Sequence, residues 1–157
     1  MNKKIKIIIA DDNKGFCDLV SKFLSKYEDI EILGIAYSDE EEIELIEKNN
    51  PEIVITDLLR NHKPTGAEII KKYNEMKRGP EFFVITADGN EDAIKNGLKV
   101  ASYLRKPFWD YDIIVQELRR IKNEVEETKN QIVVTKNESI VEIGILNRIF
   151  SLFKIRK

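Results

Sequence analysis

The sequence contains few of the residues and runs that mark several protein classes. It has one cysteine, Cys17, one histidine, His62, and no apolar run near the ~20 residues of a transmembrane helix. A lone cysteine excludes an internal disulfide, fits a reducing cytoplasm and is expected to serve packing. A lone histidine cannot build a histidine-based metal cluster. The apolar run in the basic start, MNKKIKIIIADD, is too short for a signal peptide.

The charge balance argues against a protein that binds nucleic acid broadly. A net charge of −2 with 34% charged residues predicts a soluble surface without broad nucleic-acid binding, so we expect no direct nucleic-acid partner. The 157 residues, 42% of them hydrophobic, suffice for one domain of ordinary size with a short appendage.

What the sequence does contain is an alternation of strand-like and helix-like segments. The strand-like runs are almost wholly apolar, as in strands buried on both faces, and cover residues 5–10, 30–36, 51–57, 81–87 and 101–106. Apolar residues recur at helical spacing over residues 16–27, 41–48, 69–76, 91–99 and 114–125. We expect Asp39 to cap the second helix, and Asp110 or Asp112 to lie near the start of the last. The alternation predicts an α/β fold, a doubly wound parallel sheet with helices on both faces.

The composition changes after about Glu127. Residues 128–139 are polar around a small strand-like patch and are predicted to be a linker. A C-terminal amphipathic helix would follow, with an apolar face formed by Leu146, Ile149, Phe150 and Phe153. We therefore expect a first domain over residues 1–127 and a linker plus helical tail over 128–157. The tail has three open fates: packing on the first domain, pairing with a second copy or another protein, or membrane contact.

Polar side chains follow the carboxyl ends of four predicted strands. They are Asp11 and Asp12 after the first strand, Asp57 after the third, Thr86 at the fourth and Lys106 at the fifth. In open α/β sheets this edge is where ligands bind. Three carboxylates, a hydroxyl and an ammonium group gathered there suit a divalent cation and a phosphoryl group.

Each of these residues has a possible chemical role. Mg²⁺ keeps several waters, so Asp12 and Asp57 could coordinate it while Asp11 holds a bound water. Asp57 can also act as a nucleophile toward phosphorus. Lys106 would give a point charge, and Thr86 a hydrogen bond, to phosphoryl oxygens. Taken singly, each could be a helix cap or a solvated cation; their joint occurrence on four strands predicts a shared site.

These residues, in this order, resemble the receiver domain of two-component response regulators, over about residues 3–122. The resemblance implies a flavodoxin-like (βα)₅ fold with strand order 2-1-3-4-5. It implies phosphorylation of Asp57 by a phosphohistidine on a sensor histidine kinase or a histidine phosphotransferase. It also implies Mg²⁺ bound by Asp11, Asp12, Asp57 and the backbone carbonyl of Leu59.

The resemblance further implies how the signal leaves the domain. Thr86 and Tyr103 would form a switch pair, with Tyr103 turning inward as Thr86 moves to the phosphoryl group. The bond before Pro107 would be cis. Output would pass through the fourth helix, fifth strand and fifth helix to a downstream protein partner, and a homodimer is an open alternative. Such a protein is not an enzyme with a separate substrate, because it accepts the phosphoryl group on its own aspartate.

Four segments resemble, more narrowly, the receiver half of a sporulation master regulator: IADDNKGF, GIAYSDEE, ITADGNEDA and ASYLRKPF. That regulator carries a helical DNA-binding effector domain after its receiver. The short tail here cannot form a helix-turn-helix unit, which needs a supporting helical domain. We therefore expect a signalling module without its own DNA-reading domain.

The segment after Asp57 departs from the family pattern. Arg60 and Asn61 stand where Met-Pro is usual, and His62, expected to be a plain loop residue, and Lys63 follow beside the site. Because Arg60 or Lys63 could reach the carboxylates and replace the cation electrostatically, a second hypothesis is a degenerate receiver that acts unphosphorylated as a binding or scaffold protein.

Overall fold

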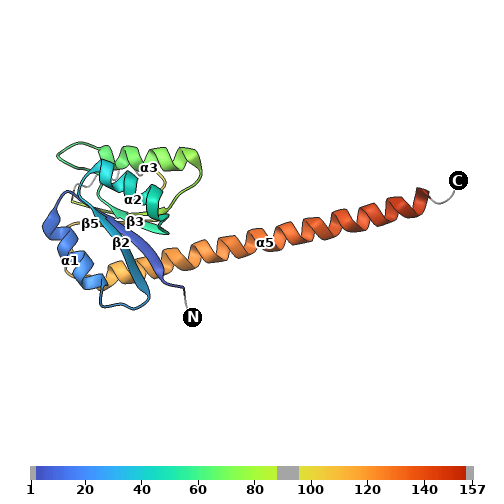
Figure 1. Ribbon diagram of the computed structural model, residues 1–157, viewed down its shortest axis with the longest axis horizontal. Coiled ribbons are helices and arrows are strands. Elements are labelled where there is room, and N and C mark those ends of the chain that lie inside the picture. Colours follow the sequence, from blue (N-terminus) through green and yellow to red (C-terminus); the bar gives the residue numbers. More distant parts are fainter. Residues whose placement is uncertain (1–2, 88–95, 155–157) are drawn as a thin grey trace. The chain divides into compact units, whose positions relative to one another are not determined.

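The computed structural model of the chain describes residues 3–87 and 96–154. Its elements, labelled in Figure 1, are β1 (Ile5–Ala10), α1 (Lys14–Leu24), β2 (Ile30–Ala36), α2 (Asp39–Asn49), β3 (Ile53–Thr56), α3 (Thr65–Met76), β4 (Glu81–Thr86), β5 (Ser102–Arg105) and α5 (Asp112–Lys154). The five strands form one sheet in the order β2-β1-β3-β4-β5, with parallel pairing throughout. The predicted fold class and strand order are confirmed.

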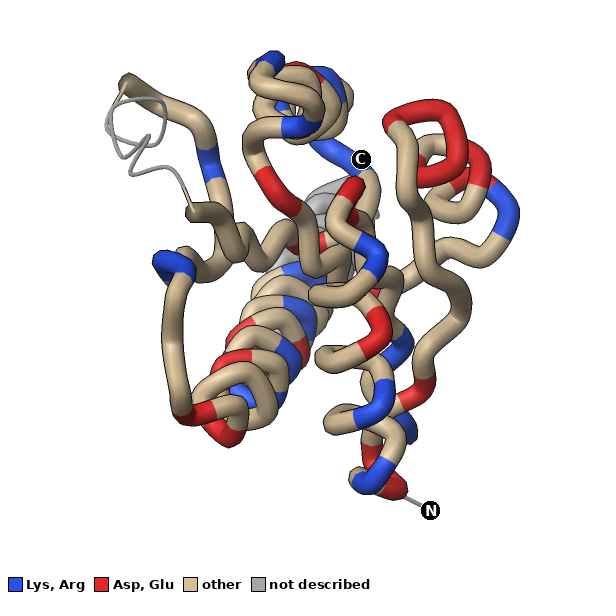
Figure 2. Tube along the Cα trace, turned by 90° about the vertical axis from the view of Figure 1, so that its left-hand side faces the viewer, with Lys and Arg blue, Asp and Glu red and all other residues tan. Residues whose placement is uncertain are grey.

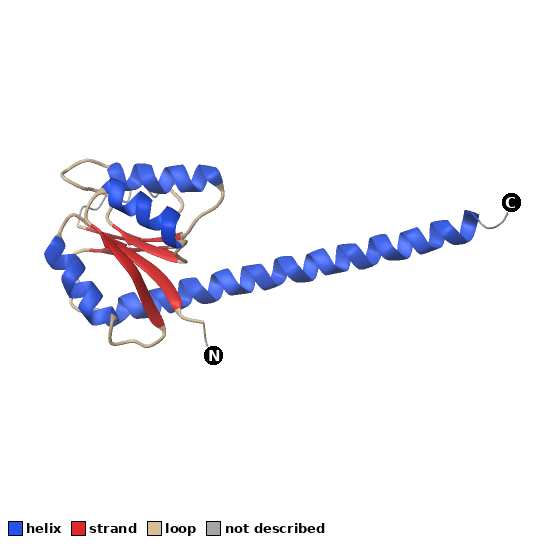
Figure 3. Cartoon of the chain, in the orientation of Figure 1, coloured by secondary structure: helices blue, strands red, loops and turns tan. Residues whose placement is uncertain are grey.

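Helices cover both faces of the sheet. In Figure 3, α2 and α3 lie on one face, while α1 and the first turns of α5 lie on the other. The middle strands β1, β3 and β4 are therefore buried almost throughout, and the edge strands β2 and β5 are mostly half-buried. Ile7, Ile8 and Ile9 have no exposed surface, and burying a side chain of this size stabilises a fold by about 1.5–3 kcal/mol.

The start of α2 differs from the expectation. The hydroxyl of Ser38 accepts a hydrogen bond from the backbone N–H of Glu41 at 3.2 Å, so Ser38 caps the helix. The Glu41 carboxylate accepts the N–H of Tyr37 at 2.7 Å, close to a capping-box arrangement. The prediction of Asp39 as the cap is wrong: Asp39 is the first helical residue, and its carboxylate pairs with Arg60.

The helix predicted near residues 91–99 falls mostly outside the described residues. Of that range the structure describes residues 96–99, which form a turn at Asn96 and Gly97 followed by irregular backbone. The strand that follows, β5, pairs with β4 in register, with Val84 opposite Tyr103 and Thr86 opposite Arg105. The register of β5 therefore places the end of this strand beside the end of β4.

The last helix corrects a second expectation. Residues 128–139, predicted to be a linker, are helical and belong to α5. Their Thr128 and Thr135 hydroxyls donate to the carbonyls of Glu124 and Gln131 at 2.8 and 2.6 Å, so these side chains do not compete with the helix. The chain divides into two compact units, residues 1–122 and 123–157, so α5 contributes to both. Among the described residues, no helix combines the length and apolar character needed to cross a membrane.

Polar contacts hold the first turns of α5 within the first unit. Arg119 donates twice to the Asp29 carboxylate, at 2.8 and 3.0 Å, and Lys122 pairs with Glu52 at 2.5 Å. Below them, Leu118 and Ile121 are buried. The start of α5 is therefore part of the same core as the sheet.

Cys17 lies in this core and has no exposed surface. Burial raises the pKa of its thiol to about 11, and the Asp11 charge adds to the rise. Because the thiolate is the reactive form, we expect native Cys17 to resist alkylation at neutral pH and to react quickly once the chain is unfolded in urea. Intact mass after timed treatment with iodoacetamide measures both rates. Equal rates in the folded and unfolded chain would contradict the burial.

Candidate functional site

The sheet brings four of the sequence-predicted residues to one edge. Asp11 follows β1, Asp57 follows β3, Thr86 ends β4 and Lys106 follows β5. Backbone hydrogen bonds extend the ladder past the strand ends: the N–H of Asp57 donates to Ala10 O at 3.2 Å, and that of Lys106 to Thr86 O at 2.9 Å. These side chains therefore start from fixed backbone positions, and the predicted grouping is correct.

Lys106 joins two of the carboxylates. Its Nζ lies 2.5 Å from Asp11 Oδ2 and 3.0 Å from Asp57 Oδ2. The ammonium group also lies 4.0 Å from the centre of the Phe16 ring, which is close enough for a cation–π contact. The peptide bond between Lys106 and Pro107 is cis, as predicted from the family resemblance. Lys106 is therefore not a solvated surface cation, which is what a single lysine at the end of a strand would usually be.

Burial and charge act in opposite directions on this pair. Burial raises the pKa of Asp11, and the hydrogen bond and charge of Lys106 only partly offset the rise. Burial by itself would lower the pKa of Lys106, but its contacts with Asp11 and Asp57 outweigh that effect and raise it. Lys106 therefore stays protonated at neutral pH and supplies a fixed positive charge between two acidic groups.

The remaining carboxylate, Asp12, faces a turn rather than Lys106. Its Oδ2 accepts the backbone N–H of Asn61 at 2.9 Å, while the N–H of Leu59 donates to Asp57 Oδ1 at 3.1 Å. Residues 60–63 form a tight hairpin turn, because the N–H and C=O of Arg60 both bond to Lys63 at 2.9 Å. The segment after Asp57 thus contributes backbone groups to the site.

The conformation of this turn is unusual for its residues. Asn61 and His62 have φ angles of 48° and 61°, in the left-handed region that a two-residue hairpin turn of this kind requires. Asparagine tolerates that region better than most residues, but histidine is a less common choice. His62 is exposed at the rim, in agreement with its predicted role as a plain loop residue.

Arg60 does not enter the site, so that part of the second hypothesis is wrong. Only 3% of its side chain is exposed, and its guanidinium contacts the carboxylates of Asp39 and Glu42 from α2. It also donates to the hydroxyl of Thr56 at 2.7 Å. Lys63 is exposed and makes no ion pair with the site carboxylates within the described part of the chain. Among the described residues, the cation that pairs with the site carboxylates is therefore Lys106, and neither Arg60 nor Lys63 does so.

The Arg60–Glu42 pair was not found in the sequence. Burial raises the pKa of Glu42, and the Arg60 charge opposes the rise. Burial alone would lower the pKa of Arg60, but Glu42 and Asp39 outweigh it and raise that pKa. One signal was present: Glu42 lies one helical turn before the buried Ile46 and so shares its inward face.

Gly66, at the start of α3, supports the site directly. A Cβ atom there would lie 1.9 Å from the carbonyl oxygen of Asp57. Only glycine permits so close an approach of α3 to the end of β3, so Gly66 fixes the backbone that carries Asp57.

Two buried hydroxyls near the site have no hydrogen-bond partner among the described residues. They belong to Thr86 and Tyr103, the predicted switch pair. Thr86 is wholly buried, and Tyr103 packs against the core cluster around Val84. An unpaired buried hydroxyl is costly, so each of these groups is suited to accept a new partner.

The site opens into a cavity of about 500 Å³, lined by Asp12, Asp57, Leu59, Asn61, His62, Thr86 and Ala87. Within the described ranges, no three carboxylate, histidine or cysteine side chains converge as a preformed metal site. Mg²⁺ needs only one or two carboxylates and keeps several waters. Asp12 and Asp57 line one cavity beside Leu59, and this all-oxygen donor set fits Mg²⁺.

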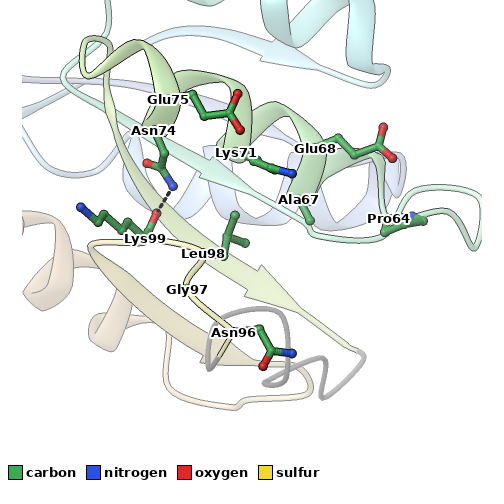
Figure 4. A pocket seen from close by; sticks show the side chains of 10 residues that line it. All are labelled: Pro64, Ala67, Glu68, Lys71, Asn74, Glu75, Asn96, Gly97, Leu98 and Lys99. Carbon is green, nitrogen blue, oxygen red and sulfur yellow. Dashed lines mark hydrogen bonds between the residues drawn. The ribbon is translucent and has the colours of Figure 1, made fainter.

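A second cavity, of about 490 Å³, lies between α3 and residues 96–99 (Figure 4). Asn74 crosses one end of it, donating from its side chain to Lys99 O at 3.0 Å. None of the sequence-predicted site residues lines this cavity. The candidate site is therefore the carboxyl edge of the sheet.

Comparison with known proteins gives a consistent result. The family model of the response regulator receiver domain matches residues 7–119. The receiver domain of the Francisella response regulator 1452 matches with a TM-score of 0.66 at 19% identity, over 78% of this chain and 99% of that one. The response regulator domain of Thermotoga maritima CheB matches with a TM-score of 0.65 at 16% identity, over 77% of this chain and 98% of that one. The isolated receiver of RcsB from Salmonella enterica, with phosphomimetic BeF₃⁻, matches with a TM-score of 0.64 at 21% identity, over 75% of this chain and 90% of that one. At such identities these structures show the shared fold alone.

Proposed function

Since this chain belongs to the family of response regulator receiver domains, we propose that it is a phosphoacceptor that takes a phosphoryl group on Asp57. The donor is a phosphohistidine on a sensor histidine kinase or a histidine phosphotransferase. The observation that carries the proposal is Lys106, which joins the Asp11 and Asp57 carboxylates at the carboxyl edge of the sheet. A degenerate site would instead lose this cation or one of its partners.

In the transfer, an Asp57 carboxylate oxygen attacks phosphorus. The bond from the histidine nitrogen to phosphorus breaks as the oxygen–phosphorus bond forms, and the electron pair stays on the histidine ring. Such a step needs positioning and charge neutralisation more than acid–base chemistry. Asp11, Asp12, Asp57 and the Leu59 carbonyl would hold Mg²⁺, which when bound neutralises phosphoryl oxygens and aligns the donor.

The protein's own residues supply the remaining functions. Lys106 is held within bonding distance of Asp57, where its charge faces one oxygen of the new phosphoryl group. The Thr86 hydroxyl, without a partner among the described residues, would donate to another. Tyr103 would respond to the movement of Thr86, and this pair is proposed as the switch.

Output would pass to a downstream protein partner through β5, α5 and the fourth helix, which is predicted between β4 and β5. Most of that predicted helix lies outside the described residues, whereas β5 and the start of α5 are described. The narrower resemblance to a sporulation regulator stays a prediction from the sequence. The protein would not turn over a separate substrate, because the accepting group is its own aspartate.

Phosphorylation can be tested by intact mass after incubation with Mg²⁺ and a small acyl-phosphate donor. We expect the wild-type protein to gain the mass of one phosphoryl group, and Asp57→Asn to gain none, since the amide lacks a nucleophilic oxygen. Asp18→Asn, at an exposed aspartate on α1, is the matched control and should react like wild type. A wild type that gains no mass, while binding its partner, would favour the unphosphorylated scaffold hypothesis.

A further inference from the structure

The second unit of the chain, residues 123–157, is helical as far as Lys154. Over residues 123–136, α5 exposes most of its side chains, and Ile132 and Val133 are 49% and 56% exposed. Half-exposed aliphatic residues on an isolated helix lose the stabilisation that burial would give them. A helix of this length gains most of its stability by packing its apolar face against something.

One heptad frame can be followed along α5, with Ser139 and Glu142 as polar breaks. Starting at Leu118, the positions called a fall on Leu118, Val125, Ile132, Ser139, Leu146 and Phe153. Leu118 is buried within the first unit, and the later a positions belong to the second unit. An apolar repeat of seven residues along one helix is the pattern of a coiled coil.

The d positions of this frame are mixed but tolerable. Thr128 and Thr135 occupy two of them, and their hydroxyl protons are already donated to backbone carbonyls of the same helix. Such a threonine presents its methyl group to a partner at little polar cost. Ile149 occupies a later d position, whereas Glu142 is a polar interruption of the kind that costs stability and fixes register.

The charges on either side of this seam are segregated by position. Lysine fills three successive e positions, Lys122, Lys129 and Lys136. The g positions before and between them carry Glu117, Glu124 and Gln131, and the one after them carries Glu138. Charges of both signs therefore run along the helix, as the tube in Figure 2 shows.

This segregation specifies the partner and its direction. In a parallel pair, each g residue meets the e residue five positions later on the other helix, so Glu124 meets Lys129 and Gln131 meets Lys136. In an antiparallel pair, g meets g and e meets e, which places glutamates against glutamates and lysines against lysines. Like charges at these positions destabilise. The pattern is complementary to itself only in the parallel, in-register arrangement.

Beyond Ser139 the seam widens. Ile143 and Phe150 occupy e positions, and Ile145 and Leu152 occupy g positions, so a, d, e and g become largely apolar. The outer positions there are mixed: Ile140 and Val141 are apolar, whereas Asn147, Arg148 and Ser151 are polar. The apolar stripe of the predicted tail, from Leu146 to Phe153, thus belongs to the same frame. We propose that residues 123–154 form a parallel, in-register, two-stranded coiled coil with a second copy of this chain.

Charge reversal in the full-length chain tests the pairing. Lys129→Glu sets one glutamate against Glu124 of the other helix and should weaken self-association about tenfold, since two such pairs per dimer change from attraction to repulsion. Glu124→Lys should weaken it similarly, and the double exchange should restore wild-type affinity. Glu127→Lys, at an outer position, is the matched control and should change the affinity little. Sedimentation equilibrium measures each dissociation constant.

Crosslinking tests the direction and register. In the parallel, in-register pair, the two copies of residue 128 face each other at a d position, so Thr128→Cys should form an intermolecular disulfide under mild oxidation. Asn130→Cys, two residues away on the outer face, should not. The native Cys17 is buried and gives the background in wild type.

Three results would overturn the proposal. A wild type that stays monomeric at all concentrations, including one that instead co-sediments with anionic lipid vesicles, has no second copy on this helix. Equal crosslinking of Thr128→Cys and Asn130→Cys, or none by either in a proven dimer, contradicts the parallel register. Failure of the double charge exchange to rescue either single variant contradicts the pairing of Glu124 with Lys129. None of these outcomes depends on whether Asp57 is phosphorylated.

Discussion

Replacing Lys106 with methionine is expected to slow phosphorylation of Asp57 by about 10²–10³-fold, the usual cost of removing one preorganised donor from a developing charge. Methionine keeps much of the length and apolar stem but removes the charge that lies 3.0 Å from Asp57. Because the pKa of Lys106 is raised in the folded chain, its charge is present below the ordinary lysine range and disappears only above it. The defect should therefore be the same across the neutral pH range. The rate of mass gain with a small phosphodonor measures it.

Lys63→Met is the matched control for this substitution. Lys63 lies in the turn beside the cavity but is exposed and makes no ion pair with the site carboxylates among the described residues. Its loss should change the rate by less than about twofold, since exposed charges are screened. Equal losses in both variants would show a general effect of positive charge. A Lys106→Met protein that reacts at the wild-type rate would remove the main support for the proposed function.

The site was predictable because its residues follow uninterrupted apolar runs. A run buried on both faces has one interpretation, a central parallel strand, and the topology of such sheets places every carboxyl end at one edge. Asp11, Asp57, Thr86 and Lys106 needed no knowledge of packing to be grouped. The contact between Lys106 and Phe16, by contrast, joins α1 to the loop after β5 and has no trace in local sequence.

The prediction that Arg60 could reach the site was wrong because the direction of its side chain depends on tertiary contacts. After Asp57 the chain turns, and the sequence does not say whether an arginine there points into the cavity or under α2. The decisive partner, Glu42, sits in a run of four acidic residues, Asp39 to Glu42, that reads as a solvated helix start. Only the helical phase with Ile46 distinguishes it. The linker predicted over residues 128–139 was wrong because Ile132, Val133 and Val134 favour a strand locally. These residues are helical because α5 continues through them.

The buried pair formed by Arg60 and Glu42 supports the last prediction. Arg60→Met should destabilise the fold by about 3–5 kcal/mol, because it leaves the Glu42 carboxylate buried without its cation. Glu42 has no exposed surface, and its second oxygen already lacks a partner among the described residues. Replacing both residues, in Arg60→Met with Glu42→Leu, should recover most of that loss, since well-packed apolar side chains often replace a buried ion pair at little cost. Free energies of unfolding in urea, compared in a double-mutant cycle, measure the coupling.

Arg119→Met provides the same substitution at an exposed pair. Arg119 donates twice to Asp29, but both side chains are roughly half exposed, so its loss should cost less than about 1 kcal/mol. A cost for Arg60→Met no larger than this would mean that Glu42 is solvated or neutral rather than held by Arg60. Arg60 also lies between Leu59 and Asn61, whose N–H groups donate to Asp57 and Asp12. The single variant should therefore bind Mg²⁺ more weakly even under conditions where it remains folded, whereas Arg119→Met should bind it as wild type does.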